Sequence, residues 1–168
     1  MKIRNMTLAG LFAALLVICA WISLPLGSLR VTLQTFGIFL ALLTLGGKWG
    51  SVSILVYIGL GIIGLPVFSG FQGGLGVLAG PTGGCIVGFI LTGLLYWLAE
   101  MLLPVNKYTK IALLALGMLI CYLTGWLWYC RYAPINFLLW CLPYLLPDIG
   151  KLILALFLSR RLEKVLHK

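Results

Sequence analysis

Asp148 and Lys151 are the residues whose types and spacing point most clearly to chemistry in this chain of 168 residues. They are three positions apart within an apolar stretch, so both would lie on one face of a helix. Each costs about 2.5 to 3.5 kcal/mol at the centre of a membrane-spanning helix. A carboxylate accepts N–H donors, and an ammonium donates to a carboxylate or carbonyl. We therefore predict ligand contact at this pair; an ion pair that only neutralises itself is the alternative.

A second group of residues could complete such a ligand site. Neutral hydrogen bonds could come from four polar side chains on the same predicted face of the membrane: Gln34, Thr35, Thr32 and Gln72. Apolar walls around a flat or aliphatic ligand could come from four aromatic residues: Trp21, Phe68, Phe71 and Tyr144. Aromatic residues are also common at membrane interfaces without any ligand, so the walls have a purely structural alternative.

The sequence lacks the residues that catalysis, zinc binding or phosphate binding would need. His167 is the only histidine and stands beside the end of the chain, so no catalytic triad or zinc site is expected within the membrane. The five cysteines have no Cys-x-x-Cys spacing and are interpreted as apolar packing residues. Gly46-Gly-Lys48 lacks the first glycine and the final Ser or Thr of a phosphate loop. We expect no enzyme activity, metal or cofactor here, and ATP energy would have to come from another subunit.

The composition fixes the setting in which these residues act. Apolar residues make up 62% of the chain, charged residues make up 9%, and the mean hydropathy is +1.16. A soluble domain carries about a quarter charged residues, so we expect an all-α integral membrane protein with one domain over 1–168. Apolar runs predict six transmembrane helices near 6–26, 31–46, 49–65, 82–103, 110–130 and 147–166. The prolines before Pro147 suggest a short irregular approach over 134–146.

The distribution of positive charge predicts the orientation in the membrane. With both termini inside, nine Lys and Arg residues face the cytoplasm, and Arg30 and Arg131 face outward. The net charge of +9 is then explained by contact with anionic lipid headgroups, and no nucleic acid is expected as a partner. The site near Asp148 would receive its ligand from outside.

Residues 64–84 are an apolar segment that contains eight of the chain's 21 glycines. Broken hydrophobic backbone at membrane depth is tolerated where it lines a cavity or packs on protein. We therefore predict an outer loop between the third and fourth helices that caps the site. The sequence Gly59-Leu-Gly-Ile-Ile-Gly64 before it resembles a dinucleotide fingerprint, but it ends a membrane helix and is interpreted as a packing face.

Small residues at four-residue spacing predict close helix contacts. Gly80, Gly84 and Gly88 are expected to pack within the bundle. Ala9 and Ala13, which have Gly10 and Ala14 beside them, could equally serve as a docking face for a partner.

Five motifs in this order resemble the BioY family, the biotin-binding S components of energy-coupling factor (ECF) transporters. They are Thr32-Leu-Gln-Thr35, Gly64-Leu-Pro-Val-Phe68, Gly73-Gly74, Gly80-Pro-Thr-Gly-Gly84 and Pro147-Asp-x-x-Lys151. The resemblance runs from about Ala9 to Arg161. Two departures are the absence of prolines in loop 26–31 and Cys85 where an aromatic residue is frequent, which bear on gating and on a pocket wall.

The resemblance implies high-affinity capture and uptake of biotin in a bacterial cytoplasmic membrane. It implies docking of Ala9 and Ala13 on a transmembrane T subunit that is driven by two ATPase subunits. Asp148 would then accept the ureido N–H groups of biotin, and Lys151 would contact its carbonyl or its carboxylate. An S component for thiamine or riboflavin and a membrane enzyme remain as alternatives.

Overall fold

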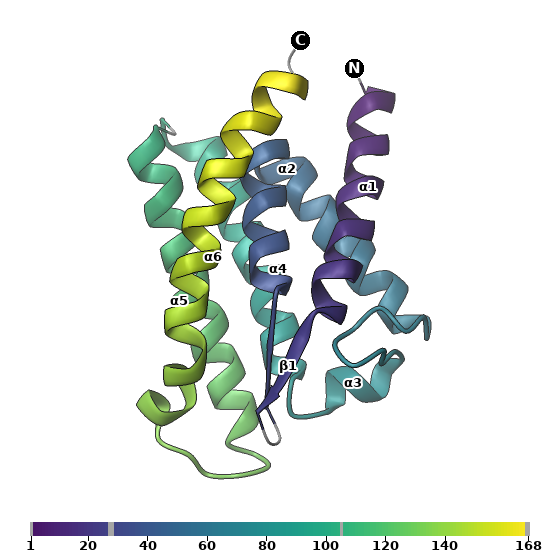
Figure 1. The fold of residues 1–168 in the computed structure, drawn as a ribbon, viewed down its shortest axis with the longest axis vertical. Helices are drawn as coiled ribbons and strands as arrows, with labels where there is room; N and C mark the ends of the chain where they lie inside the picture. The colour runs from purple at the N-terminus through teal and green to yellow at the C-terminus, as the bar shows by residue number, and fades with distance from the viewer. Residues whose placement is uncertain (1, 27–28, 105, 167–168) are drawn as a thin grey trace.

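The computed structural model describes residues 2–26, 29–104 and 106–166, which form a mostly helical bundle (Figure 1). Residues 27–28, which belong to the loop with the family departure, and His167 lie outside the described residues. In chain order the elements are α1 (Lys2–Trp21), β1 (Ser23–Leu26), β2 (Leu29–Thr32), α2 (Gln34–Ile62), α3 (Leu75–Ala79), α4 (Gly83–Leu102), α5 (Lys107–Tyr129) and α6 (Phe137–Leu166).

Five of these helices are long and apolar enough to cross a membrane: α1, α2, α4, α5 and α6. The predicted helices at 82–103 and 110–130 match α4 and α5 within three residues at each end. The expectation of a helical membrane protein is therefore confirmed at this level.

Helix α2 contains a sharp reversal at Gly46, whose backbone has φ 77° and ψ 173°. A Cβ placed on Gly50 would lie 2.9 Å from the Cα of Leu42, although eight residues of straight helix span about 12 Å. The amide of Gln34 donates to the hydroxyl of Tyr57 at 2.7 Å. The two arms therefore lie side by side, and they correspond to the separate helices predicted over 31–46 and 49–65.

The segment after the first helix is not helical, which corrects two predicted boundaries and the all-α description. Helix α1 ends at Trp21 rather than at residue 26, and α2 begins at Gln34 rather than at residue 31. Between them, β1 and β2 pair antiparallel from Ser23 opposite Thr32 to Leu26 opposite Leu29. Pro25 removes a backbone hydrogen bond that a helix would use, and Val31 and Thr32 are β-branched residues that favour a strand. Apolar composition alone did not reveal this change of backbone.

The last helix begins ten residues earlier than predicted. Helix α6 starts at Phe137 and continues through Pro143 and Pro147, so the irregular approach over 134–146 is wrong for most of its length. Proline is tolerated inside membrane helices because neighbouring groups satisfy the backbone carbonyls that it leaves free. The expectation that proline interrupts a helix, which holds for soluble proteins, is therefore wrong for α6.

Glycines allow α4 and α5 to pack closely against each other. A Cβ on Gly84 would lie 2.3 Å from the Cβ of Trp128, and one on Gly88 would lie 2.7 Å from the Cα of Cys121. The predicted packing within the bundle is confirmed for Gly84 and Gly88, whereas a Cβ on Gly80 would lie nearest to the backbone of Gly76 and Val77 in its own segment.

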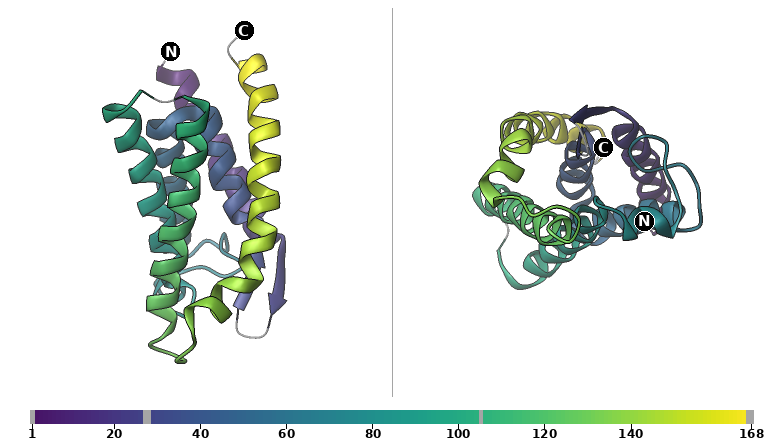
Figure 2. Two further views of the ribbon diagram at one scale, coloured as in Figure 1. Left: turned by 90° about the vertical axis from the view of Figure 1, so that its left-hand side faces the viewer. Right: turned by 90° about the horizontal axis from the view of Figure 1, so that it is seen from below.

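The elements that surround the candidate site gather at one end of the bundle. Helix α1 begins and α6 ends at the upper end in Figure 1, whereas the β1–β2 hairpin and α3 lie at the lower end. Figure 2 shows the same separation from a second direction.

The glycine-rich segment 63–82, here called the lid, contains α3 and inserts Phe68 into the core, where it is 2% exposed. Gly61 makes room for this ring, because a Cβ there would lie 2.1 Å from it.

Candidate functional site

A cavity lies at the lower end of the bundle, between the hairpin, the lid and four helices. Its lining comes from β2, α2, the lid, α4, α5 and α6: Arg30, Thr32, Gln34, Thr35, Phe68, Ser69, Val77, Pro81, Thr82, Cys85, Ile86, Phe89, Cys121, Tyr122, Trp140, Tyr144, Asp148 and Lys151. Most of this surface is apolar or aromatic, and the charged groups are few. Such a composition is typical of a site for a small organic molecule.

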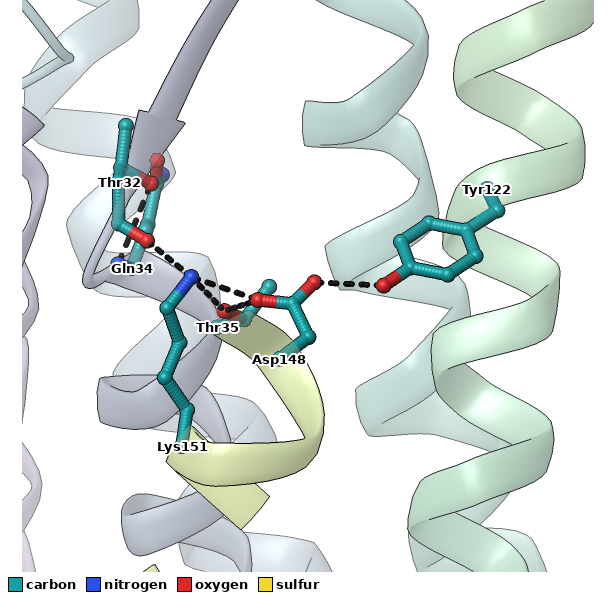
Figure 3. Close-up of polar contacts among 6 residues, drawn as sticks. All are labelled: Thr32, Gln34, Thr35, Tyr122, Asp148 and Lys151. Carbon is teal, nitrogen blue, oxygen red and sulfur yellow. Dashed lines mark hydrogen bonds and ion pairs between the residues drawn. The ribbon is translucent and has the colours of Figure 1, made fainter. Parts of the chain in front are cut away.

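The polar groups of the cavity centre on Asp148 (Figure 3). Its Oδ1 accepts from the Nζ of Lys151 at 2.6 Å and from the hydroxyl of Thr35 at 2.8 Å. Its Oδ2 accepts from the hydroxyl of Tyr122 on α5 at 2.8 Å. Asp148 is 1% exposed, so these donors replace the water that a charged carboxylate would otherwise need. With about four acceptor positions on a carboxylate, one remains for a further donor.

Lys151 joins α6 to the strand β2 as well as to Asp148. Its Nζ donates to the backbone oxygen of Thr32 at 2.6 Å and to the hydroxyl of Thr35 at 3.2 Å. Together with Asp148 these acceptors use all three N–H donors of the ammonium. The ion pair considered from the sequence is therefore present, and it also lines the cavity.

Six of the seven predicted ligand residues meet at this cavity: Asp148, Lys151, Gln34, Thr35, Phe68 and Tyr144. They come from α2, the lid and α6, and the bonded pair Thr35 and Asp148 lies 113 residues apart in the sequence. Gln72 is the exception, since its side chain is exposed and does not line the cavity. Its backbone oxygen accepts from the N–H of Phe68 at 2.9 Å and thereby shapes the lid.

Several lining residues were not singled out as ligand contacts from the sequence. Tyr122 and Trp140 look like ordinary aromatic residues of apolar helices, and Arg30 was considered only for its charge. The rings of Trp140 and Tyr144 lie 5.2 Å apart and form one wall. Cys85 does line the cavity, so its departure from the family pattern falls on a pocket wall. The hydroxyl of Tyr122 in an apolar helix was the available signal, but Thr124 and Tyr129 on the same helix carry one too.

The other two predicted aromatic walls hold the lid in place. The indole N–H of Trp21 donates to the backbone oxygen of Pro66 at 2.9 Å. Its ring lies 5.0 Å from that of Phe71. Neither residue lines the cavity, so their contact fastens the lid to the end of α1.

The predicted docking pair, Ala9 and Ala13, lies inside the bundle. Each is 2% exposed, in the helix α1 that packs extensively on α2. The exposed small residues of α1 are their neighbours Gly10 and Ala14. Both pairs have the same spacing, so the sequence could not tell which one faces outward. This burial favours Gly10 and Ala14, rather than Ala9 and Ala13, as the surface open to a partner.

Comparisons with known proteins agree with one another. The profile of the BioY family matches residues 1–168. A probable biotin transporter BioY of Pyrococcus horikoshii is 40% identical over 97% of this chain and 98% of that protein. The biotin transporter BioY of Thermotoga maritima is 52% identical over 52% of each chain.

Among solved structures, the S component for biotin from an ECF-type ABC transporter superposes with a TM-score of 0.84. It is 28% identical, and the match covers 97% of this chain and 92% of that one. The match to the family profile extends from the first residue to the last. This chain therefore belongs to the BioY family.

Proposed function

We propose that this protein captures biotin at the cavity and serves as the substrate-specific subunit of an ECF-type importer. The observation that carries the proposal is the buried Asp148 and Lys151 network at the wall of an otherwise apolar cavity. The names of the relatives and the superposable biotin S component support the same substrate.

The chemistry of biotin fits the cavity group by group. The free acceptor position of Asp148 suits a ureido N–H, and the bond would be charge-assisted. The indole nitrogen of Trp140 is buried with no acceptor among the described residues, so it offers a donor to the ureido carbonyl. Phe68 and Tyr144 offer aromatic surface to the sulfur-containing ring. Lys151 in this arrangement fixes the position of Asp148 through their 2.6 Å contact.

The topology suits uptake from outside the cell. We propose that the two arms of α2 are separate spans, which gives six, and that both termini face the cytoplasm of a bacterial cell. In this orientation the hairpin and the lid form the outer face, and the cavity lies on the side of the membrane opposite the cytoplasm, where ATP is present. The chain would have no ATPase site of its own and no cofactor, and a T subunit with two ATPase subunits would supply the energy.

The test is equilibrium binding of labelled biotin to the purified protein in detergent. Unlabelled biotin, thiamine and riboflavin serve as competitors. We expect tight binding that only unlabelled biotin displaces. Displacement by thiamine or riboflavin would reassign the substrate, and no binding by a folded sample would refute capture.

A further inference from the structure

Arg30 is a charged residue of the cavity that the proposed chemistry leaves without a role. It lies on β2, two residues before Thr32, and lines the cavity together with Ser69 of the lid. Its guanidinium packs against the lid at Gly70, where a Cβ would lie 2.2 Å from its Nη1 atom. Within residues 2–26, 29–104 and 106–166, no carboxylate forms an ion pair with Arg30, which leaves its donors available.

The only other cation in the cavity lining is already occupied. The three donors of Lys151 are used by Thr32, Thr35 and Asp148. The charge of Asp148 beside it repels a second carboxylate. An anionic group of a ligand would therefore find its favourable partner elsewhere in the cavity.

The strand fixes the separation between the two polar regions. Arg30 and Thr32 lie on the same face of β2, because side chains alternate along a strand. Two residues of strand span about 7 Å, and Lys151 is bound at the Thr32 end. A ligand with a hydrogen-bonding head and an acid on a short aliphatic chain could reach both regions at once.

We infer that Arg30 binds the carboxylate of the substrate and makes the site selective for the free acid over neutral derivatives. This inference rests on the proposed capture of biotin and adds the residue that recognises its acid end. A planar guanidinium can form two parallel bonds to a carboxylate. Its packing under Gly70 would place these bonds beneath the closed lid.

The experiment compares biotin with biotin methyl ester, which keeps the head and loses the charge. Both ligands are titrated into the wild type, Arg30→Gln and Arg30→Lys. The control is Arg131→Gln, which removes the other predicted outer arginine. Arg131 is exposed, stacks on Trp128 at 4.6 Å and does not line the cavity.

We expect Arg30→Gln to weaken biotin binding about 10- to 100-fold, the range for a lost bond to a charged group. Binding of the ester should change less than threefold, Arg30→Lys should be intermediate, and the control should match the wild type. Equal losses for acid and ester, or none for either, would overturn the role of Arg30. If the wild type bound neither ligand, the proposed function itself would fail.

Discussion

At the scale of single residues, the site depends on a carboxylate that is buried and satisfied by its neighbours. Asp148 receives three donors from α2, α5 and α6. A buried charge that loses its partner is strongly destabilising, so the role of each group in binding must be separated from its role in folding. Two predictions make this separation.

Asp148→Asn should reduce biotin affinity at least 100-fold, because the amide cannot offer a charged acceptor to a ureido N–H. The same change leaves Lys151 without its counter-charge and should lower the thermal unfolding temperature. The double variant Asp148→Asn with Lys151→Met removes both charges and should recover much of that stability without recovering binding. Binding by either variant at the wild-type level would contradict the proposed role of Asp148.

Tyr122→Phe removes one donor to Asp148 and leaves the ring in place. We expect about a tenfold loss of biotin affinity, the usual effect of deleting one hydrogen bond to a charged group. Tyr108→Phe is the matched control, since Tyr108 lies on the same helix, is 79% exposed and does not line the cavity. Isothermal titration of both variants measures the difference, and equal affinities would remove Tyr122 from the site.

At the scale of elements, the hairpin and the lid close the cavity together. Arg30 of the hairpin packs against Gly70 of the lid, and Lys151 of α6 is bonded to the backbone of β2. The lid is also fastened to α1 through Trp21. A change at the contact between the hairpin and the lid should therefore affect ligand binding more than it affects the bundle.

Gly70→Ala tests this contact. Gly70 has φ +74°, and a Cβ there would overlap the Arg30 guanidinium. Backbone strain and displacement of Arg30 should both weaken biotin binding, by about 5- to 150-fold if the cost is about 1 to 3 kcal/mol. Gly76→Ala, in the same lid but with open space around it, should bind like the wild type. Indistinguishable affinities for the two variants would argue against a closed lid in the bound state.

The exposed face of α1 gives a prediction about the partner subunits. Gly10 and Ala14 are exposed, and a Cβ on Gly10 would meet nothing within 4 Å. The variant with Gly10→Leu and Ala14→Leu should therefore fold and bind biotin normally. Close approach of a partner helix needs small residues, so biotin uptake by the proposed complex with a T subunit and ATPase subunits should fall at least tenfold.

The control for this variant is Gly150→Leu, on an exposed part of α6 that also has open space around it. Uptake measured in proteoliposomes that contain the full complex should stay near wild type for Gly150→Leu. Normal uptake by the α1 variant would place the docking surface elsewhere.

At the scale of the whole molecule, the cavity and the positive charge lie at opposite ends. The α4–α5 connection, the start of α1 and the end of α6 share the upper end in Figure 1. These regions carry most of the lysines and arginines of the chain. By the positive-inside rule, this distribution supports the proposed orientation, with the upper end in the cytoplasm.

Cysteine labelling of intact cells tests this orientation. In a variant whose native cysteines are replaced by serine or alanine, Leu24→Cys on the hairpin should react with a membrane-impermeant maleimide. Tyr108→Cys near the start of α5 should react only after the cells are opened. Both native side chains are at least 70% exposed, so burial would not explain a difference. The reverse pattern would invert the proposed topology.

The sequence by itself determined the class of protein and the most important pair of charges. The composition indicated a helical membrane protein. The spacing of Asp148 and Lys151 placed both on one helix face. The free-energy cost of a charged side chain inside a membrane implied that each interacts with another polar group. Small residues at four-residue spacing predicted the α4–α5 contact correctly. These conclusions depend on hydrophobicity and helical periodicity, which are properties of the chain alone.

The tertiary structure decided which residues meet and which ones face outward. Tyr122 and Arg30 joined the site only when α5 and the β1–β2 hairpin were placed beside α6, while Gln72 remained outside the cavity. Gly10 and Ala14, rather than Ala9 and Ala13, proved to be the exposed small pair. Periodicity places residues on a common face, but the rotation of that face is set by packing against other helices. The sequence therefore supplied the chemistry, and the packing of distant segments determined where that chemistry is accessible.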